Sequence, residues 1–203
     1  GMGQFFYENK IKFQRPKFII SSPVNENGPS NEGYWKVGPR NKVLAPVGGG
    51  KDSIITIELL KQTKKDFHCF SLNPTEAAKK IMELAGCQNP IIVKRKIDKK
   101  LLELNRKRFL NGHTPFSAYL AFLSVLAAAI FDYKYIAFSN EKSADEGNLK
   151  YLGKTINHQW SKSSEFERKF KNYCKKYLTK KINYFSLVRP FTELEISKMF
   201  SKY

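Results

Sequence analysis

The sequence predicts an α/β protein with an open, mainly parallel sheet and helices on both faces. Short apolar runs alternate with helical segments between Lys42 and Phe138, a pattern typical of βαβ units. The 203 residues are 41% hydrophobic and 14% aromatic, which supports one sizeable core and excludes a disordered chain. No apolar run reaches the ~20 residues of a membrane span, so we expect no membrane partner.

The elements follow one another in a regular order. Residues 43–47 form a run that is apolar on both faces, which suits a central parallel strand. Thr75 and Gly86 provide start and stop signals for the helix between them. The predicted strands are 43–47, 66–72, 91–93 and 135–138, and the predicted helices are 53–60, 75–85, 98–110 and 115–131.

Both ends of the chain depart from this alternation. Residues 1–41 are broken by Pro and Gly, so we expect an N-terminal arm or the remnant of a longer N-terminal region. Residues 42–203 are expected to form the main domain. Within these limits we predict short strands at 5–7 and 18–20, a polar loop at 139–159, a basic amphipathic helix at 164–178 and a capped helix at 192–200.

Charge and cysteine content narrow the partners and the compartment. The 36 Lys and Arg outnumber 18 acids, and the formal net charge of +18 favours an anionic partner such as nucleic acid, nucleotide phosphates or an acidic metabolite. Cys69, Cys87 and Cys174 are widely and irregularly spaced. We therefore expect neither a disulfide framework nor a structural zinc site. The three cysteines are expected to be buried as thiols. A reducing cytoplasm is the expected location.

The most informative string is Gly48-Gly49-Gly50-Lys51-Asp52-Ser53, where the first strand turns into the first helix. Glycines there let backbone N–H groups converge on one anion, and the helix N-terminus adds its dipole. The string matches neither a Walker A loop nor a Gly-x-Gly-x-x-Gly fingerprint. It predicts a phosphate-binding loop of another type; the alternative is a glycine turn that merely connects strand and helix.

A polar stretch follows the fourth predicted strand directly. Because the carboxyl ends of parallel strands meet at one edge of a sheet, Glu141, Asp145 and Glu146 are expected to lie near the glycine loop. Their carboxylates could bind the Mg²⁺ that accompanies a nucleoside triphosphate. Residues 111–150 carry three Lys and four acids, a net charge of −1 in a strongly basic chain. A solvated acidic loop is the alternative.

Two of the three histidines, His113 and His158, stand in loops just before predicted helices. A loop histidine can carry a proton near neutral pH or donate a hydrogen bond to phosphate. It can equally be an exposed side chain without a task. Both are therefore candidates for acid/base chemistry, with that alternative open.

These strings together resemble the UDP-N-acetylmuramoyl-L-alanyl-L-glutamate epimerase family of the PP-loop ATP pyrophosphatases. The glycine loop fits the superfamily pattern Ser-Gly-Gly-x-Asp-Ser, with Gly48 in place of the first Ser. The resemblance covers about residue 42 to the end and implies a Rossmann-like PP-loop fold with a C-terminal helical extension. Members are roughly twice this size, with an N-terminal portion that this chain mostly lacks, so the resemblance implies the C-terminal catalytic portion, either as a shorter relative or as a piece of a longer chain. The matching strings are PVGGGKDS (46–53), LN (104–105), LNGHTP (110–115), SNEKSADE (139–146), NHQWSKS (157–163), FE (166–167) and YFSLVRP (184–190).

The resemblance implies an ATP-dependent inversion of the terminal L-Glu to D-Glu through an acyl-adenylate, with release of AMP and pyrophosphate. Adenylation of the carboxylate makes the neighbouring α-proton easier to remove. The implied partners are ATP, Mg²⁺ and an anionic UDP-linked muramoyl dipeptide. The implied roles are pyrophosphate binding by Gly48, Gly49, Gly50, Lys51, Asp52 and Ser53, Mg²⁺ binding by Asp145 or Glu146, catalysis by Asp52, Glu141, His113 and His158, and substrate binding by Lys162 and Arg189.

Two other classes stay open. A PP-loop tRNA-modifying enzyme would use the basic helix at 164–178 as an RNA surface. The aromatic residues at 166, 170, 173 and 177 share one face of that helix, however, and are more simply explained as core. The third class is a nucleotide-binding domain without full activity. A salt-sensitive gel shift with tRNA would favour the tRNA-modifying enzyme. Titration with ATP and Mg²⁺, together with a pyrophosphate assay, distinguishes a nucleotide-binding domain from an enzyme. The oligomeric state is left open.

Overall fold

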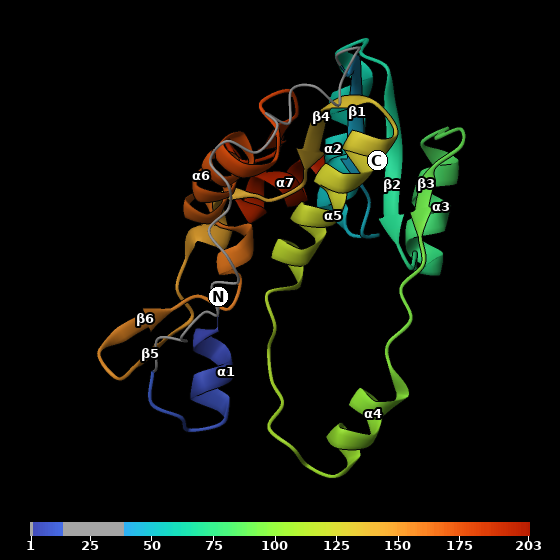
Figure 1. The fold of residues 1–203 in the computed structure, drawn as a ribbon. Coiled ribbons are helices and arrows are strands. Elements are labelled where there is room, and N and C mark those ends of the chain that lie inside the picture. The colour runs from blue at the N-terminus through green and yellow to red at the C-terminus, as the bar shows by residue number, and fades with distance from the viewer. Residues whose placement is uncertain (1, 14–38) are drawn as a thin grey trace.

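The structure, a computed structural model, describes residues 2–13 and 39–203. Five strands form one sheet in the order β3-β2-β1-β4-β7, and every neighbouring pair is parallel. Helices cover both faces (Figure 1), so the predicted fold class is confirmed. The strands are β1 Arg40–Pro46, β2 Phe67–Leu72, β3 Ile91–Val93, β4 Tyr133–Phe138, β5 Leu149–Tyr151, β6 Lys154–Ile156 and β7 Asn183–Ser186. The α-helices are α1 Gly3–Glu8, α2 Lys51–Gln62, α3 Glu76–Leu84, α4 Lys99–Arg106, α5 Phe116–Ile130, α6 Ser164–Tyr173 and α7 Glu193–Phe200.

The sheet core sits in two layers because side chains alternate between the faces of each strand. Leu44 and Ile136 point to one face and pack with the buried side chains of α5 and α6. Val43 and Ala45 point to the other face, where α2 closes the core with Leu60. β1 is the central strand and is buried on both sides, as its continuous apolar run predicts.

Helix ends lie where their capping residues predict. The Thr75 side chain accepts a hydrogen bond from the Ala78 N–H at 3.1 Å, and Gly86 ends the helical turn with φ +69°. Thr192 and Glu195 form the predicted capping box at the start of α7. These local signals fix where α3 and α7 begin, a few residues after β2 and β7.

Several local predictions are wrong. Residues 5–7 are predicted as a strand but belong to α1, whose Tyr7 packs edge-to-face on Tyr151. The predicted loop 139–159 contains the β5–β6 hairpin, whose turn uses positive φ at Leu152 and Gly153. Leu-Gly is not the usual signal for such a turn. The edge strand β7 was not predicted, and the predicted strand at 18–20 lies outside the described residues.

The cysteine and aromatic predictions are corrected in part. Cys69 and Cys87 are joined by a disulfide, because the fold brings β2 and the end of α3 together, which sequence spacing does not reveal. Cys174 is free and buried, as predicted. Of the predicted aromatic face of the basic helix, Phe166 and Phe170 are buried whereas the tyrosines at 173 and 177 are exposed. The helix continues from residue 174 as a π-helical turn, which changes the rotation per residue.

The longest apolar helix is α5, with 15 residues. Across the described segments, no helix is long and apolar enough to cross a membrane.

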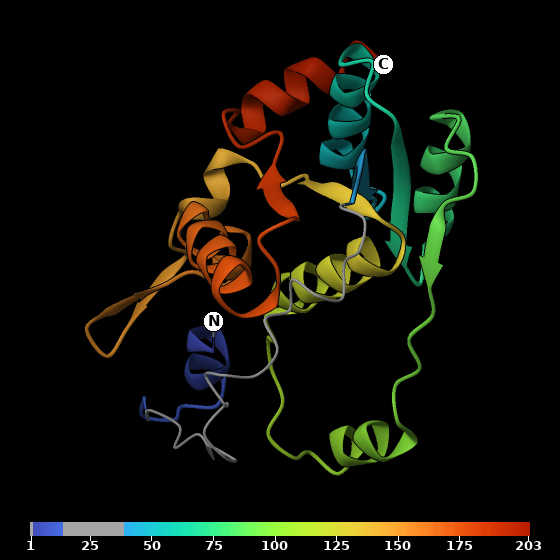
Figure 2. The same cartoon turned by 45° about the horizontal axis from the view of Figure 1, so that its top comes forward.

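Figures 1 and 2 also show that α4 stands apart from the rest of the chain, between β3 and α5.

Candidate functional site

A cavity of about 420 Å³ opens at the carboxyl ends of β1, β2 and β4. Parallel sheets form such a crevice where the strand order changes direction, and here β1 is followed by β2 on one side and lies beside β4 on the other. Gly48 and Asp52 line it from the first loop, and Ser139 and Asn140 line it from the fourth. The loops after the first and fourth predicted strands therefore share one cavity, as predicted.

The glycine loop is open on its cavity side and tightly packed behind. A Cβ atom on Gly49, whose φ is +96°, would lie 3.0 Å from the Ala78 nitrogen. A Cβ atom on Gly48 or Gly50 would meet nothing within 4 Å. The Gly48 N–H donates to Ser53 Oγ at 3.2 Å, which closes the loop. The backbone at Gly48 and Gly50 can thus be approached closely by a ligand.

Two buried polar atoms of the cavity-lining residues have no hydrogen-bond partner among the described residues: Asp52 Oδ1 and Ser139 Oγ. Lys51 Nζ lies 3.7 Å from Asp52 Oδ1 but makes its shorter contact, 3.1 Å, with Glu193. Burial raises the pKa of Asp52, partly opposed by the positive charge of Lys51. Buried polar atoms without a hydrogen bond are costly, and these two belong to residues on both sides of the cavity, where a polar ligand could satisfy them.

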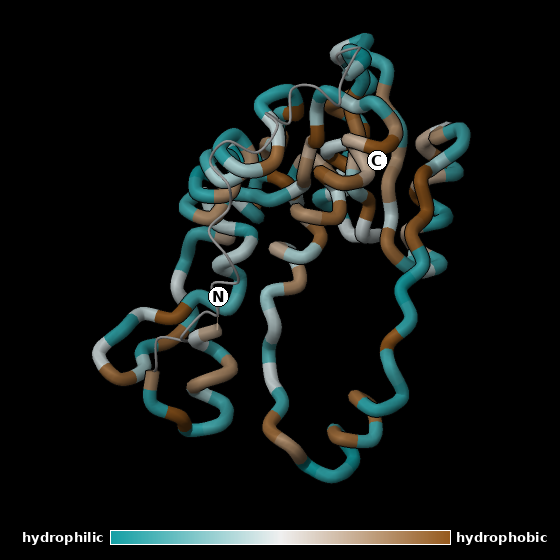
Figure 3. Tube along the Cα trace, in the orientation of Figure 1, coloured by the Kyte–Doolittle hydropathy of each residue, from teal (hydrophilic) through white to brown (hydrophobic). Residues whose placement is uncertain are grey.

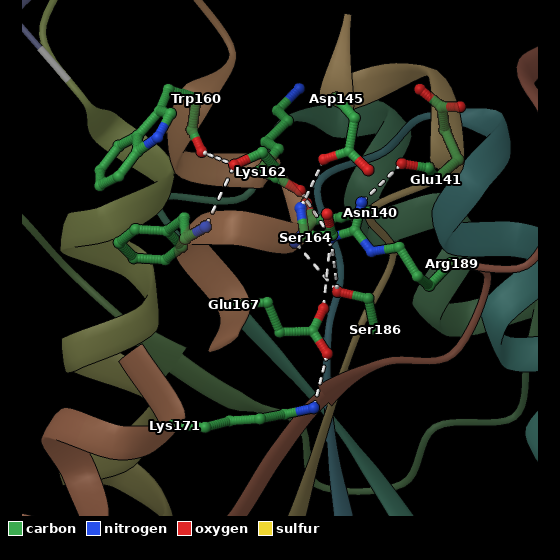
Figure 4. Close-up of polar contacts among 12 residues, drawn as sticks. Asn140, Glu141, Asp145, Trp160, Lys162, Ser164, Glu167, Lys171, Ser186 and Arg189 are labelled. Atoms are coloured by element: carbon green, nitrogen blue, oxygen red, sulfur yellow. Dashed lines mark hydrogen bonds and ion pairs between the residues drawn. The ribbon is translucent and has the colours of Figure 1, made fainter. Parts of the chain in front are cut away.

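Arg189 lies in a network of internal hydrogen bonds (Figure 4). Its Nη1 donates to the Glu141 carbonyl at 2.7 Å. Its Nη2 donates to the Lys162 carbonyl at 2.6 Å and to Glu167 Oε2 at 3.2 Å. The guanidinium predicted to bind substrate therefore joins three segments of the chain: the loop after β4, the turn before α6, and α6 itself.

Glu167 and Asn140 extend this network toward the cavity. Burial acts to raise the pKa of Glu167, but hydrogen bonds from Lys171 and Ser186 and nearby positive charge outweigh it and lower the pKa overall. Asn140 Nδ2 donates to Ser186 Oγ at 3.1 Å. Asn140 also lines the cavity, so the Arg189 network fixes one wall of it.

The predicted magnesium ligands lie elsewhere. Asp145 Oδ1 accepts a hydrogen bond from the Ser164 N–H at 2.6 Å, Glu146 is exposed, and neither lines the cavity. Within residues 2–13 and 39–203, no group of three or more His, Cys, Asp or Glu side chains could hold a metal ion. Among the described residues that line the cavity, Asp52 supplies the one carboxylate; its Oδ1 is buried without a hydrogen bond and lies 3.7 Å from Lys51 Nζ.

The remaining acid/base candidates occupy the loops around the site. The rings of His113 and His158 are in edge-to-face contact, with centroids 5.9 Å apart. Their backbone N–H groups donate to Glu8 and to Asn148. Glu141 Oε2 accepts from the Ser143 N–H at 2.6 Å and so caps a short turn. The structure brings the two histidines together, outside the residues that line the cavity.

Sequence reasoning missed several residues of the cavity wall. Lys162 was predicted and does line it. Ser71 Oγ donates to the Val47 carbonyl at 2.9 Å and holds β2 beside the glycine loop. The missed lining residues share one signal, since most directly follow a strand or begin a helix: Ser71, Asn73, Thr75, Phe116, Ser117, Ser139 and Asn140.

A larger cavity, about 480 Å³, lies at the opposite end of the sheet. It is lined by apolar side chains such as Val43, Leu60 and Val125, together with lysines at its edge. It includes neither the glycine loop nor a strand's carboxyl end other than that of β7. The smaller cavity is therefore the better candidate despite its size.

Comparison with known proteins gives consistent matches. The family model described as MurL N-terminal domain matches residues 1–187. A UDP-N-acetyl-alpha-D-muramoyl-L-alanyl-L-glutamate epimerase of Micromonospora sp. is 36% identical over 202 residues, and one of Xanthomonas oryzae pv. oryzae is 31% identical over 204. Each match covers 100% of this chain and 44% of the relative, so the chain spans less than half of their length. A predicted tRNA methyltransferase subunit from Methanocaldococcus jannaschii has 16% identity and a TM-score of 0.47, covering 80% of this chain and 75% of its own, too distant to bear on function.

Proposed function

Because the chain belongs to the MurL N-terminal domain family, we propose that it acts in the ATP-dependent epimerisation of the terminal L-Glu of UDP-N-acetylmuramoyl-L-alanyl-L-glutamate. The expectation that it is the C-terminal portion is wrong, since the matching model is that of the N-terminal domain. The relatives carry the epimerase activity in their names. The observation that carries the proposal is the open glycine loop in the same cavity as two buried atoms without a hydrogen bond, Asp52 Oδ1 and Ser139 Oγ.

In this proposal the glycine loop binds the pyrophosphate of ATP. The N–H groups at the start of α2 and the dipole of its 12 residues favour an anion at this point, and Gly48 and Gly50 leave room for it. Lys162, which lines the same cavity, adds a positive charge. The substrate carboxylate attacks the α-phosphorus, an acyl-adenylate forms, and pyrophosphate leaves.

Asp52 supplies the carboxylate for the cation that accompanies ATP. Bound Mg²⁺ would neutralise phosphate charge during the transfer. Asp52 Oδ1, which accepts no hydrogen bond in the chain alone and which Lys51 Nζ approaches only to 3.7 Å, then gains a closer partner. Burial of this oxygen without a hydrogen bond is explained as preparation for the ligand.

The inversion step requires a proton to leave one face of the α-carbon and another to arrive at the opposite face. Adenylation makes this proton more acidic because the carboxylate charge is removed. Glu141, His113 and His158 are the proposed acid and base candidates.

The test uses the chain with ATP, Mg²⁺ and the L-Glu-terminated UDP-muramoyl dipeptide. We expect pyrophosphate release that depends on the dipeptide, followed by D-Glu in chiral analysis of the hydrolysed product. Asp52→Asn should abolish release, while Asp145→Asn, which changes an exposed carboxylate outside the cavity, should leave it within about twofold. If the unmodified chain released no pyrophosphate in the presence of the dipeptide, the proposal would be contradicted.

A further inference from the structure

Residues 96–110, here called the α4 segment, extend away from the rest of the chain in both views (Figures 1 and 2). α4 has no buried residue. Among the described residues, every hydrogen bond and ion pair of the segment joins two of its own members, such as Lys100 with Glu103 and Lys107 with Glu103. The segment is thus attached to the body only through its two ends.

An eight-residue helix is not stable in water by itself. Asp98 caps α4 through the Lys100 N–H, but one cap does not replace tertiary packing. Five large apolar side chains of the segment are 44–65% exposed: Ile97, Leu101, Leu102, Phe109 and Leu110. Such a helix is normally stabilised by burying its apolar side against another surface.

The outward face of α5 carries further exposed apolar side chains. The chain passes from the α4 segment into α5, and Phe116, Tyr119, Leu126 and Ile130 on that helix are 42–63% exposed. Their spacing places them on one side of the helix, opposite the buried Ala121 and Ala128. Arg95 rests on the rings of Phe116 and Tyr119 at 5.2 and 5.8 Å. Figure 3 shows apolar residues interspersed with polar ones on α4.

Charge limits what can cover this surface. The α4 segment holds six Lys or Arg against two acids, a net charge of +4. A second copy of the chain, which also carries +18, would bring like charges together, and this disfavours self-association. An occupant needs an apolar patch with acidic side chains around it.

We infer that the α4 segment and the outward face of α5 form the docking surface for the part of the MurL relatives that lies outside their match to this chain. The chain aligns over its whole length with only 43–44% of each relative, and the matching model is an N-terminal domain. More than half of each relative therefore has no counterpart here. The docked region would present acidic and apolar side chains to α4 and α5.

The experiment uses this chain and, as probe, the portion of the Micromonospora relative outside its matched segment, produced as a separate polypeptide. We expect a complex in calorimetry and in size-exclusion chromatography with light scattering. Leu101→Glu and Leu126→Glu should each weaken binding at least about tenfold. Leu84→Glu, which places the same charge on the exposed face of α3, should not.

Lack of binding at ~100 μM, a tenfold excess over a dissociation constant of ~10 μM, would overturn the inference. Equal binding by the Leu101, Leu126 and Leu84 variants would also overturn it. A dimer of the chain alone that Leu126→Glu disrupts would assign the surface to a second copy and would count against it. Because binding is measured without ATP, failure here leaves the proposed adenylation untouched, and failure of pyrophosphate release leaves the docking surface untouched.

Discussion

Two neighbouring polar regions at the carboxyl edge of the sheet differ in how their polar atoms are used. At the glycine loop, Asp52 Oδ1 has no hydrogen-bond partner and burial raises the pKa of its carboxyl. Around Arg189, the carboxylate of Glu167 is bound by Lys171 and the guanidinium, and its pKa is lowered. Both regions hold motif residues and each keeps a buried atom without a hydrogen bond, Arg189 Nε in the second, but only the second has its carboxylate bound by two cationic side chains. The difference separates residues placed for a ligand from residues that hold the walls in position.

The largest expected effect separates activity from stability at the glycine loop. Asp52→Asn removes the carboxylate proposed to meet the metal–nucleotide complex, so pyrophosphate release should fall at least about 100-fold. The melting temperature should stay level or rise, because burial disfavours the charge of this carboxylate more than Lys51 favours it, and a neutral amide removes that charge. Calorimetric melting and a pyrophosphate assay on one preparation check both. A drop in melting temperature with retained release would contradict the assignment.

In contrast to Asp52→Asn, the substitution Arg189→Met should mainly lower the stability of the fold. It leaves Glu167 and two carbonyl oxygens without their partner, and breaking such a buried pair costs about 3 kcal/mol. Urea denaturation measures the loss in free energy of unfolding. In the double variant Arg189→Met/Glu167→Gln, part of that loss should be recovered, since no buried carboxylate is left without the guanidinium. If the free energy of unfolding were unchanged and substrate binding were weakened, Arg189 would be a substrate-binding residue, which would contradict this prediction.

Glycine substitutions sharpen the contrast within the loop. Gly49→Ala places a Cβ atom 3.0 Å from the Ala78 nitrogen at φ +96° and should cost about 2 kcal/mol of stability. Gly48→Ala meets no atom within 4 Å, so the fold should tolerate it while nucleotide affinity falls. Urea denaturation and ATP titration distinguish the two. Equal destabilisation by both substitutions would show that the loop is a packed turn rather than an open cradle.

The pH dependence of stability should have opposite signs for the two carboxylates. The lowered pKa of Glu167 contributes stability that is present above its unfolded value of about 4.3 and is lost as pH falls through its folded pKa. The raised pKa of Asp52 makes its ionisation unfavourable, so stability is lost as pH rises from about 3.9 through its folded pKa. Urea denaturation between pH 3 and 7 measures both effects. Compared with the unmodified chain, Glu167→Gln should lose less stability as the pH falls, and the stability of Asp52→Asn should increase more steeply as the pH rises. Identical slopes in both variants would contradict these shifts.

The sequence predicts the central sheet well because its strands are apolar on both faces and its helices carry clear caps. Val43–Val47, Thr75 and Thr192 are examples in which local chemistry and tertiary structure agree. The β5–β6 hairpin and the disulfide were missed because Leu152-Gly153 is an unusual turn and Cys69 meets Cys87 only after folding.

The candidate site divides in the same way. The glycine loop could be placed from sequence, since its strand-to-helix position determines where it points, and Lys162 could be placed from the family resemblance. The role of Arg189 could not, because its partners come from residues 22 to 48 positions away. Asp145 likewise reads as a metal ligand in sequence, while the fold uses one of its oxygens to bind the Ser164 N–H.

Soaking a crystal of the chain with α,β-methylene-ATP and Mg²⁺ most directly tests whether the glycine loop binds the phosphates of a nucleotide. We predict density for the two terminal phosphates within hydrogen-bond distance of the backbone between Gly48 and Ser53, with the cation near Asp52 Oδ1. Nucleotide bound at another surface, or a loop that stays without phosphate at millimolar analogue, would contradict it.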